Sequence, residues 1–265
     1  MGIVNVTPDS FSDGGQYFGD PSNPQAAIAR ALAVIEQGAQ IVDVGGESTR
    51  PGAPPVDVDT ELARVLPVIE ALAKAGHCVS VDTKKPEVMR QAIAAGAAIV
   101  NDVFALQAPG ALEICTQSDV GVVLMHMQGE PGTMQKAPHY NDVVSEVAAF
   151  LKARTAACQS AGIDPSRLAI DPGFGFGKTL DHNKELTRRL RELVALGFPL
   201  VAGWSRKSSL GAITGHASAE DRVSASVAAA LACVSRGARI VRVHDVRETV
   251  DVLKVWSAFE DGDNG

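Results

Sequence analysis

The chain is poor in cysteine, positive charge and long apolar runs, and each shortage excludes a class of protein. Its four cysteines, Cys78, Cys115, Cys158 and Cys233, are widely separated and form no C-x-x-C pair. We therefore expect free core thiols in a reducing compartment rather than disulfides or a zinc site. Lysine and arginine number 24 against 31 aspartates and glutamates, a net charge of −7. This balance argues against nucleic acid or an anionic membrane as the main partner.

The distribution of apolar residues excludes a membrane-spanning protein. No run approaches the ~20 apolar residues needed to cross a bilayer. No positively charged leader precedes an apolar segment, so we expect a cytoplasmic protein. The 265 residues suit one barrel domain of ~250 residues. We place that domain at residues 1–259 and expect residues 260–265, "EDGDNG", to be a disordered tail.

A short junction recurs along the chain, in which a helix-like stretch ends at glycine and an apolar run follows. It occurs in "EQGAQIVDVG", "AAGAAIVND" and "SRGARIVRVH". A glycine just past a helix can adopt the left-handed conformation that terminates the helix. The apolar runs that follow are short and rich in Ile and Val, which is typical of strands buried on both faces.

Eight such apolar runs occur, near residues 2–6, 41–44, 78–81, 98–100, 121–125, 168–170, 199–202 and 239–243. Amphipathic stretches such as "PQAAIARALAVIEQ" and "NDVVSEVAAFLKARTAACQ" separate most of them. This alternation predicts an α/β fold, a single-domain (β/α)8 TIM barrel with long loops after strands 1 and 2. A doubly wound open sheet is the alternative, which the lack of a G-x-G-x-x-G after the first strand disfavours.

Polar residues stand at or just after the ends of the predicted strands, where the active site of such a barrel lies. They are Asn5, Asp43, Asp82, Asn101, Met125 (the one apolar member), Asp171, Lys207, Arg242 and His244. A buried carboxylate costs several kcal/mol unless it is paired. The convergence of so many ionisable groups therefore predicts a functional site. Carboxylates and an asparagine suit a flat heterocycle with N–H and amino donors, with a lysine and an arginine on its carbonyl or face.

Several of these positions also have a purely structural interpretation. Asp82 directly precedes "TKKPEV" and can cap the helix expected there. Arg206 can form a surface salt bridge. The segment "DPGFGFGKT" lacks the spacing of a phosphate loop. Its glycines allow the backbone to pass close to a ligand, with Phe176 as a pocket wall and Phe174 favoured as a core residue.

Two further patterns point to anion binding. Ser208 in "SRKSSLG" is a candidate N-cap, and a helix N-terminus favours an anion such as a carboxylate. Arg242 and His244 alternate along one strand and so share a face that can meet a phosphate. Three long connections, residues 7–22, 45–57 and the segment "HMQGEPGTMQK", have the length and composition of closing loops.

Eight motifs in order then identify a resemblance over essentially the whole chain. They are "MGIVNVTPDSFSDGG", "VDVGGESTRPGA", "SVDT", "VNDV", "LMHMQGEPGTMQ", "DPGFGFGKTLDHN", "SRKS" and "RVHDV". Together they closely resemble the dihydropteroate synthase family of folate biosynthesis. The resemblance implies a TIM-barrel transferase that condenses 6-hydroxymethyl-7,8-dihydropterin diphosphate with 4-aminobenzoate, requires Mg²⁺, is the sulfonamide target and forms a homodimer.

The resemblance also implies a role for each matching residue. The pterin pocket corresponds to Asp82, Asn101, Met125, Asp171, Lys207 and Arg242. The diphosphate site corresponds to Asn5, Arg242 and His244, with Asn5 also a Mg²⁺ ligand. The aminobenzoate site and its closing loops correspond to Phe11, Asp13, Thr49, Arg50, Pro51, Phe176 and Ser208. Because a C–O bond to diphosphate breaks and the attacking amine is neutral at pH 7, we expect an SN1-like reaction.

The chain departs from the usual family pattern in three places. It begins at the first motif, where relatives usually carry a preceding segment, and Trp204 and Ser209 replace the usual Val and a larger apolar residue. No predicted helix is conspicuously apolar on its outer face, so the homodimer rests on the resemblance alone. Two rival functions are a pterin-binding methyltransferase domain and a pterin-binding protein without catalysis. The loops "SFSDGG" and "ESTRPG" disfavour the first, and the intact charged residues disfavour the second.

Overall fold

Eight short parallel strands lie at the centre of the computed structural model, which describes residues 1–7, 24–48, 55–130 and 132–260. Their bounds agree with the eight predicted runs to within about two residues at each end. The strands are β1 (Gly2–Asn5), β2 (Val42–Gly45), β3 (Val79–Asp82), β4 (Ile99–Asp102), β5 (Gly121–Met125), β6 (Leu168–Asp171), β7 (Val201–Ala202) and β8 (Ile240–Val241).

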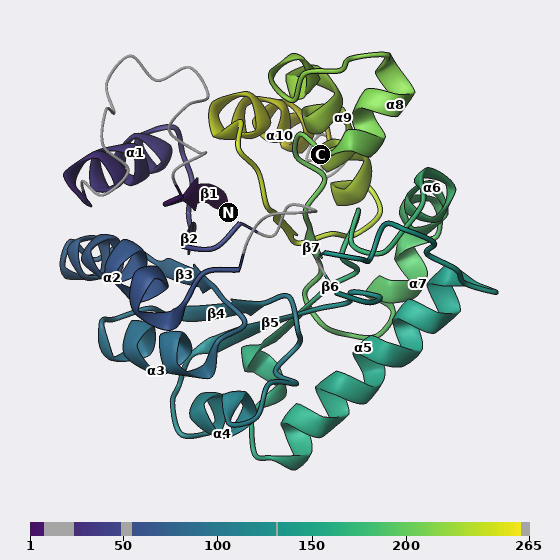
Figure 1. Ribbon diagram of the computed structural model, residues 1–265. Helices are drawn as coiled ribbons and strands as arrows, with labels where there is room; N and C mark the ends of the chain where they lie inside the picture. The colour runs from purple at the N-terminus through teal and green to yellow at the C-terminus, as the bar shows by residue number, and fades with distance from the viewer. Residues whose placement is uncertain (8–23, 49–54, 131, 261–265) are drawn as a thin grey trace.

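Helices surround the strands on the outside (Figure 1). They are α1 (Pro24–Glu36), α2 (Val58–Lys74), α3 (Pro86–Ala94), α4 (Ala111–Thr116), α5 (Val143–Ser160), α6 (Leu180–Arg188), α7 (Leu190–Val194), α8 (Ser208–Thr214), α9 (Val223–Val234) and α10 (Val246–Glu260). Two short 3-10 turns, η2 (Pro165–Arg167) and η3 (Glu220–Arg222), complete the described elements.

The strands form a closed barrel rather than an open sheet. Strands β1 to β6 pair in sequence order, and β7 pairs with β8. Isolated parallel bridges join the two sheets at both seams, from Ile170 to Leu200 and from Gly2 to Val243. Backbone hydrogen bonds of 2.9 Å (Ile3 N to Val243 O) and 3.0 Å (Val243 N to Met1 O) close the ring between the first and last strands. The predicted (β/α)8 barrel is confirmed.

Local sequence signals explain where the helices start and stop. Asp57 accepts a 2.7 Å hydrogen bond from the backbone N–H of Thr60 and so caps α2. Asp142 caps α5 in the same manner. The glycine junctions predicted from the sequence have φ angles of +104° at Gly38 and +103° at Gly96, a conformation that stops a helix and favours glycine.

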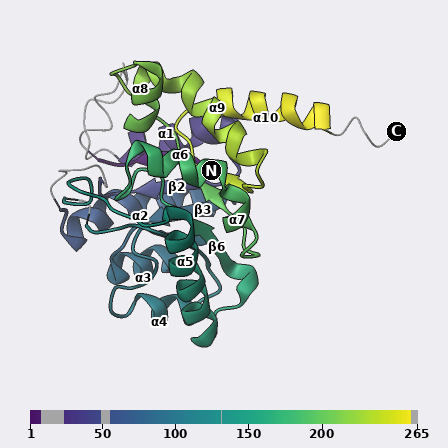
Figure 2. The same ribbon diagram turned by 90° about the vertical axis from the view of Figure 1, so that its right-hand side faces the viewer.

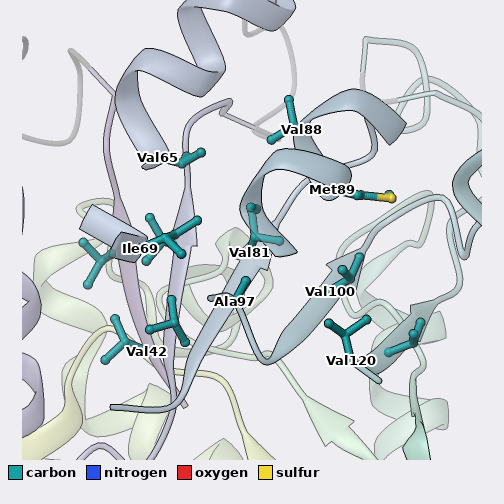
Figure 3. Close-up of a cluster of buried hydrophobic side chains, with 14 of the residues drawn as sticks. Val42, Val65, Ile69, Val81, Val88, Met89, Ala97, Val100 and Val120 are labelled. Carbon is teal, nitrogen blue, oxygen red and sulfur yellow. The ribbon is translucent and has the colours of Figure 1, made fainter. Parts of the chain in front are cut away.

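The core lies between the helices and the strands. Val65 and Ile69 of α2 and Val88 and Met89 of α3 contribute to the same cluster as strand residues such as Val81 (Figure 3). All five side chains have no exposed surface. Since each strand is covered by helices outside and by neighbouring side chains inside, its near-continuous apolar sequence follows.

Three expectations about the periphery can be compared with the structure. Cys115, Cys158 and Cys233 are buried free thiols, but Cys78 is exposed, so the expectation of four core thiols is wrong for Cys78. Cys78 directly precedes β3, outside the packed layer between helices and strands. Of the predicted tail, Glu260 ends α10, and residues 261–265 lie outside the described residues. No described helix is both long and apolar enough to span a bilayer.

Candidate functional site

A row of polar side chains stands at the carboxyl ends of the first four strands. The parallel register pairs Asn5 with Gly45, Gly45 with Asp82, and Asp82 with Asn101. Because paired residues of parallel strands point to the same face, Asn5, Asp82 and Asn101 share one layer at the barrel mouth. Gly45 contributes no side chain, and the oxygens Asn5 Oδ1 and Asp82 Oδ2 lie 3.5 and 3.7 Å from the point where a side chain would begin.

Arg242 extends over this mouth from the end of β8, which adjoins β1 at the seam of the barrel. Its Nε donates to Asp43 Oδ2 at 2.6 Å and its Nη2 donates to Asp82 Oδ2 at 2.6 Å. One guanidinium therefore joins the segment after β8 to β2 and β3. The structural alternative for Asp82 is not realised, because Lys85 occupies the N-cap position of α3 and Asp82 pairs with Arg242.

Asp43 is a member of the predicted strand-end set for which no individual role was predicted. It lies two residues before Gly45, hence one layer deeper in the barrel, and has no exposed surface. Its Oδ2 also accepts a 3.1 Å hydrogen bond from Asn101 Nδ2, while its Oδ1 is buried without a partner. Its position at a strand end was the available signal. The choice of carboxylates that Arg242 contacts depends on how the barrel closes. The spacing of residues in the sequence does not reveal it.

Asp171 and Met125 stand side by side at the ends of β6 and β5, where the register pairs them. Both are about 5% exposed. Asp171 Oδ1 accepts a 2.6 Å hydrogen bond from the backbone N–H of Gly173. Its Oδ2 lies 3.9 Å from the point where a side chain on Gly203 would begin, and the Cβ of Arg242 lies 4.0 Å from the same point. Gly203 thus leaves space between Asp171 and Arg242.

Lys207 reaches the mouth from the connection after β7. Its Nζ donates to the carbonyl oxygen of Phe174 and lies 4.7 Å from the centre of the Phe176 ring. Phe176 is partly exposed, as a pocket wall requires. Phe174 is fully buried and stacks on Trp204 with ring centres 4.9 Å apart, so its prediction as a core residue is confirmed. Trp204 therefore packs beneath the connection after β6, against the ring of Phe174.

Ser208 is not the N-cap of its helix, and that expectation is wrong. Helix α8 begins at Ser208 itself, and Lys207 occupies the N-cap position without a capping side-chain hydrogen bond. Lys207 has the extended backbone of a cap residue, with φ −67° and ψ 150°. Ser208 is exposed at the first helical position, and its neighbour Ser209 accepts a 3.2 Å hydrogen bond from Asn183 Nδ2.

His244 and Arg206 are joined to the mouth by contacts between the last two connections. The Oγ of Ser205 lies 3.0 Å from both the backbone nitrogen and Nδ1 of His244. Arg206 has a left-handed backbone (φ 58°) and forms a salt bridge with Asp245, which is 7% exposed. The alternative of a salt bridge for Arg206 is confirmed, but its partner Asp245 is buried and does not lie at the surface. The pair positions Lys207 and His244, the neighbours of Arg206 and Asp245.

Burial dominates the electrostatics of the mouth. It raises the pKa of Asp82 to about 7, against the opposing effect of Arg242. It also raises the pKa of Asp171, which Lys207 partly offsets. Burial lowers the pKa of Lys207 to about 8, although Asp171 acts in the other direction. Groups with such shifted pKa values in one concave site are typical of a binding or catalytic centre.

The described residues do not form a metal cage of their own. No group of three His, Cys, Asp or Glu side chains within the described ranges is arranged to hold an ion. The side-chain oxygen of Asn5 lies beside the carboxylate of Asp82, across the space over Gly45. Mg²⁺ commonly takes only one or two protein oxygens and completes its shell with phosphate and water. The donor set therefore fits a Mg²⁺ that arrives with a phosphorylated ligand.

Five predicted site residues cannot be placed. Phe11, Asp13, Thr49, Arg50 and Pro51 lie outside the described residues. Of the ten that the structure describes, it brings eight to one end of the barrel: Asn5, Asp82, Asn101, Met125, Asp171, Phe176, Lys207 and Arg242. Carboxylates, an amide and two cations at one mouth can bind a flat, polar heterocycle through its edge and its face.

Known proteins are similar to this chain in both sequence and fold. The sequence profile described as pterin binding enzyme matches residues 1–244. A dihydropteroate synthase of Neisseria meningitidis serogroup B is 56% identical over 264 residues, covering 98% of this chain and 92% of that relative.

Solved structures agree. Xanthomonas albilineans dihydropteroate synthase with 4-aminobenzoic acid has a TM-score of 0.91 and 54% identity, covering 98% of this chain and 92% of that one. The complex of the Xanthomonas albilineans enzyme with 7,8-dihydropteroate has a TM-score of 0.87, at 52% identity and the same coverage. A sulfonamide complex of the Yersinia pestis enzyme has a TM-score of 0.92 at 45% identity, covering 98% and 94%. The chain belongs to the pterin-binding enzymes and, within them, to the dihydropteroate synthase family.

Proposed function

We propose that this chain is a transferase that condenses 6-hydroxymethyl-7,8-dihydropterin diphosphate with 4-aminobenzoate in folate biosynthesis. The products are 7,8-dihydropteroate and diphosphate. The observation that carries the proposal is the gathering of Asp82, Asn101, Asp171, Lys207 and Arg242 at one barrel mouth. The ligands of the solved relatives, 4-aminobenzoic acid and 7,8-dihydropteroate, are one substrate and the product of this reaction.

The pterin ring binds by complementary hydrogen bonds. The carboxylates of Asp82 and Asp171 accept from its N–H and amino groups, and Asn101 can both donate and accept. Lys207 donates to the ring carbonyl, Met125 forms part of the wall, and the guanidinium of Arg242 covers the ring face. Each role uses the atom type that the side chain presents at the mouth.

The diphosphate lies against Asn5, Arg242 and His244. The side chains of Arg242 and His244 offset the negative charge that develops on the leaving oxygen. We propose that Asn5 also contributes an oxygen ligand to Mg²⁺, which would neutralise part of the diphosphate charge when bound. Asn5 and Asp82 flank the same space over Gly45, so the metal and pterin sites would adjoin.

The bond that breaks joins the pterin methylene carbon to a diphosphate oxygen, and its electron pair leaves with diphosphate. The cation left on the methylene is stabilised by the electron-rich dihydropterin, whose N–H groups contact two carboxylates. The amine nitrogen of 4-aminobenzoate then bonds to the methylene and releases a proton. Because that amine is already neutral, positioning and exclusion of water contribute more than a strong base.

The 4-aminobenzoate site adjoins Phe176 and Ser208. Phe176 is partly exposed beside Lys207, and Ser208 begins α8 one residue further along the chain. We propose that Phe11, Asp13, Thr49, Arg50 and Pro51 complete this site as closing loops, and that sulfonamides compete there with 4-aminobenzoate. We also propose a cytoplasmic location, since the buried thiols of Cys115, Cys158 and Cys233 are free.

A homodimer is the proposed assembly. Val255 and Phe259 of α10 are 55% and 78% exposed. Together with Trp256 of the same helix and Leu231 of α9, they line a groove of ≈ 320 Å³. The end of α10 extends past the other helices (Figure 2). The expectation that no outer helix face is apolar is therefore wrong for α10. A second copy would remove this apolar surface from water.

Purified protein should form dihydropteroate only when both substrates and Mg²⁺ are present, as measured by chromatography of the products. Asp82→Ala and Lys207→Ala should abolish turnover while circular dichroism shows an intact fold, because each removes a group that binds the pterin. Lys184→Met, at a partly exposed position of α6 where the lysine pairs with the exposed Asp181, serves as the control with unchanged turnover. Wild-type rates in both pocket variants would refute the pocket, and methyl transfer or pterin binding without product would favour the rival functions.

The pH dependence should be bell-shaped. Asp82 must be ionised to accept from the pterin, so kcat/KM for the dihydropterin substrate should rise as pH increases through about 7. Lys207 must be protonated to donate, so kcat/KM should fall as pH increases through about 8. Steady-state rates at saturating 4-aminobenzoate measure both limbs. Lys207→Arg should lose the alkaline limb in its residual activity, and a flat profile in the wild type would contradict the assignment.

Analytical ultracentrifugation should give twice the chain mass of 27.6 kDa. The double variant Val255→Asp with Phe259→Asp should sediment as a monomer, because each aspartate places a charge in the proposed contact. Leu32→Asp, on the exposed side of α1, should leave the dimer intact. A monomeric wild-type protein, or a double variant that stays dimeric, would exclude this interface.

A further inference from the structure

A lysine that faces no solvent lies beneath the pocket. Lys178 ends the connection from β6 to α6 and is 3% exposed. Its Nζ lies 2.9 Å from Nδ1 of His126, 3.0 Å from the carbonyl oxygens of Gly173 and Phe176, and 3.4 Å from the carbonyl of His126. Three polar groups thus lie within 3.0 Å of this nitrogen, and burial, followed by the charge of Lys207, lowers the pKa of Lys178 well below its usual value. Its hydrogen-bonding capacity is filled by the protein itself.

The state of His126 suits this contact. Burial, followed by the nearby Lys178, lowers the pKa of His126 to about 3. The imidazole is therefore neutral at physiological pH, and Nδ1 is available to accept from Lys178. His126 directly follows β5, so Lys178 ties the connection after β6 to the end of the neighbouring strand.

The backbone carbonyls of this connection are held by side-chain donors from the connection and from neighbouring segments. Each of its five consecutive carbonyls, from Gly173 to Gly177, accepts a hydrogen bond from a side chain. In chain order the donors are Lys178, Lys207, Gln135, Lys178 and Tyr140. Lys178 is the only donor in this set that binds two of the carbonyls, those of Gly173 and Phe176. The Phe174 carbonyl, to which Lys207 donates, lies between these two in the chain.

The backbone also lies directly against the end of β5. Gly173 and Gly177 have φ angles of +66° and +61°. A side chain on Gly173 would begin 1.9 Å from the carbonyl oxygen of His126, and one on Gly177 would begin 2.3 Å from that of Gln128. Such contacts are impossible for any residue but glycine. The connection therefore has little room to shift if its hydrogen bonds remain.

We propose that Lys178 is a positioning residue for pterin binding that acts through Lys207. By binding the carbonyls on either side of Phe174, it directs the Phe174 carbonyl toward Lys207 and sets the Phe176 ring beside the same ammonium group. Without Lys178, Lys207 loses its fixed acceptor and is free to approach Asp171, the acidic group whose charge already acts on it. The inference rests on the proposed function only in that Lys207 binds the pterin.

The test is a double-mutant cycle on the dissociation constant of dihydropterin diphosphate, measured by isothermal titration calorimetry. Lys178→Met keeps the apolar length of the side chain and removes its donors. It should weaken binding about tenfold, the scale expected for a lost hydrogen bond to a charged group. Lys207→Met should weaken binding at least as much, and the double variant should bind no more weakly than Lys207→Met alone. Lys184→Met should bind as the wild type does.

Full additivity of the two effects would overturn the inference, because a lysine that only stabilises the fold would not act through Lys207. Wild-type affinity in Lys178→Met would overturn it as well. Should Lys178→Met not fold, Lys178→Leu, which likewise lacks every donor, enters the same cycle with the same two criteria. A wild-type protein that fails to bind dihydropterin diphosphate would refute the proposed function and this inference with it.

Discussion

The guanidinium of Arg242, bound to Asp43 and Asp82, is the interaction on which the barrel mouth depends. It joins the segment after the last strand to the second and third strands, 199 and 160 residues away in the chain. Removing one member would leave a buried charge without its partner, which is far more costly than the pair itself is stabilising. Asn101 adds a hydrogen bond to the same Asp43 oxygen, so the four side chains form one connected set.

The closed barrel makes this set possible. Parallel register aligns Asn5, Asp82 and Asn101 in one layer and leaves Asp43 one layer below. The seam between β8 and β1 brings Arg242 within reach of both layers. On the other side of the mouth, backbone carbonyls of the connection after β6 accept hydrogen bonds from Lys207 and Lys178. The polar groups of the mouth thus belong to the ends of different strands.

Much of this was predictable from the sequence, for identifiable reasons. Strands buried on both faces appear as short apolar runs, and their polar successors fall at the mouth once the barrel is assumed. This logic found Asp82, Asn101, Asp171 and Lys207. It could not say which carboxylates Arg242 contacts, because that depends on ring closure, and so Asp43 received no role.

The failures have equally local causes. Ser208 was expected to cap a helix, a side-chain propensity, but the helical backbone begins one residue earlier, at Ser208 itself, and leaves Lys207 at the cap. Lys178 received no role, since sequence alone does not show that its nitrogen faces inward. Cys78 was counted with the apolar run 78–81, but it lies just before β3 and is exposed.

The central claim is that the charge set around Arg242 organises the pocket, and Asp43→Asn tests it most directly. This change keeps the shape and the acceptor for Asn101 but removes the buried negative charge beneath Arg242. The account predicts that kcat/KM for dihydropterin diphosphate falls about a hundredfold in a folded protein, as expected when one partner of a buried charge pair is neutralised. A value within about twofold of the wild type, in the range of experimental scatter, would contradict it.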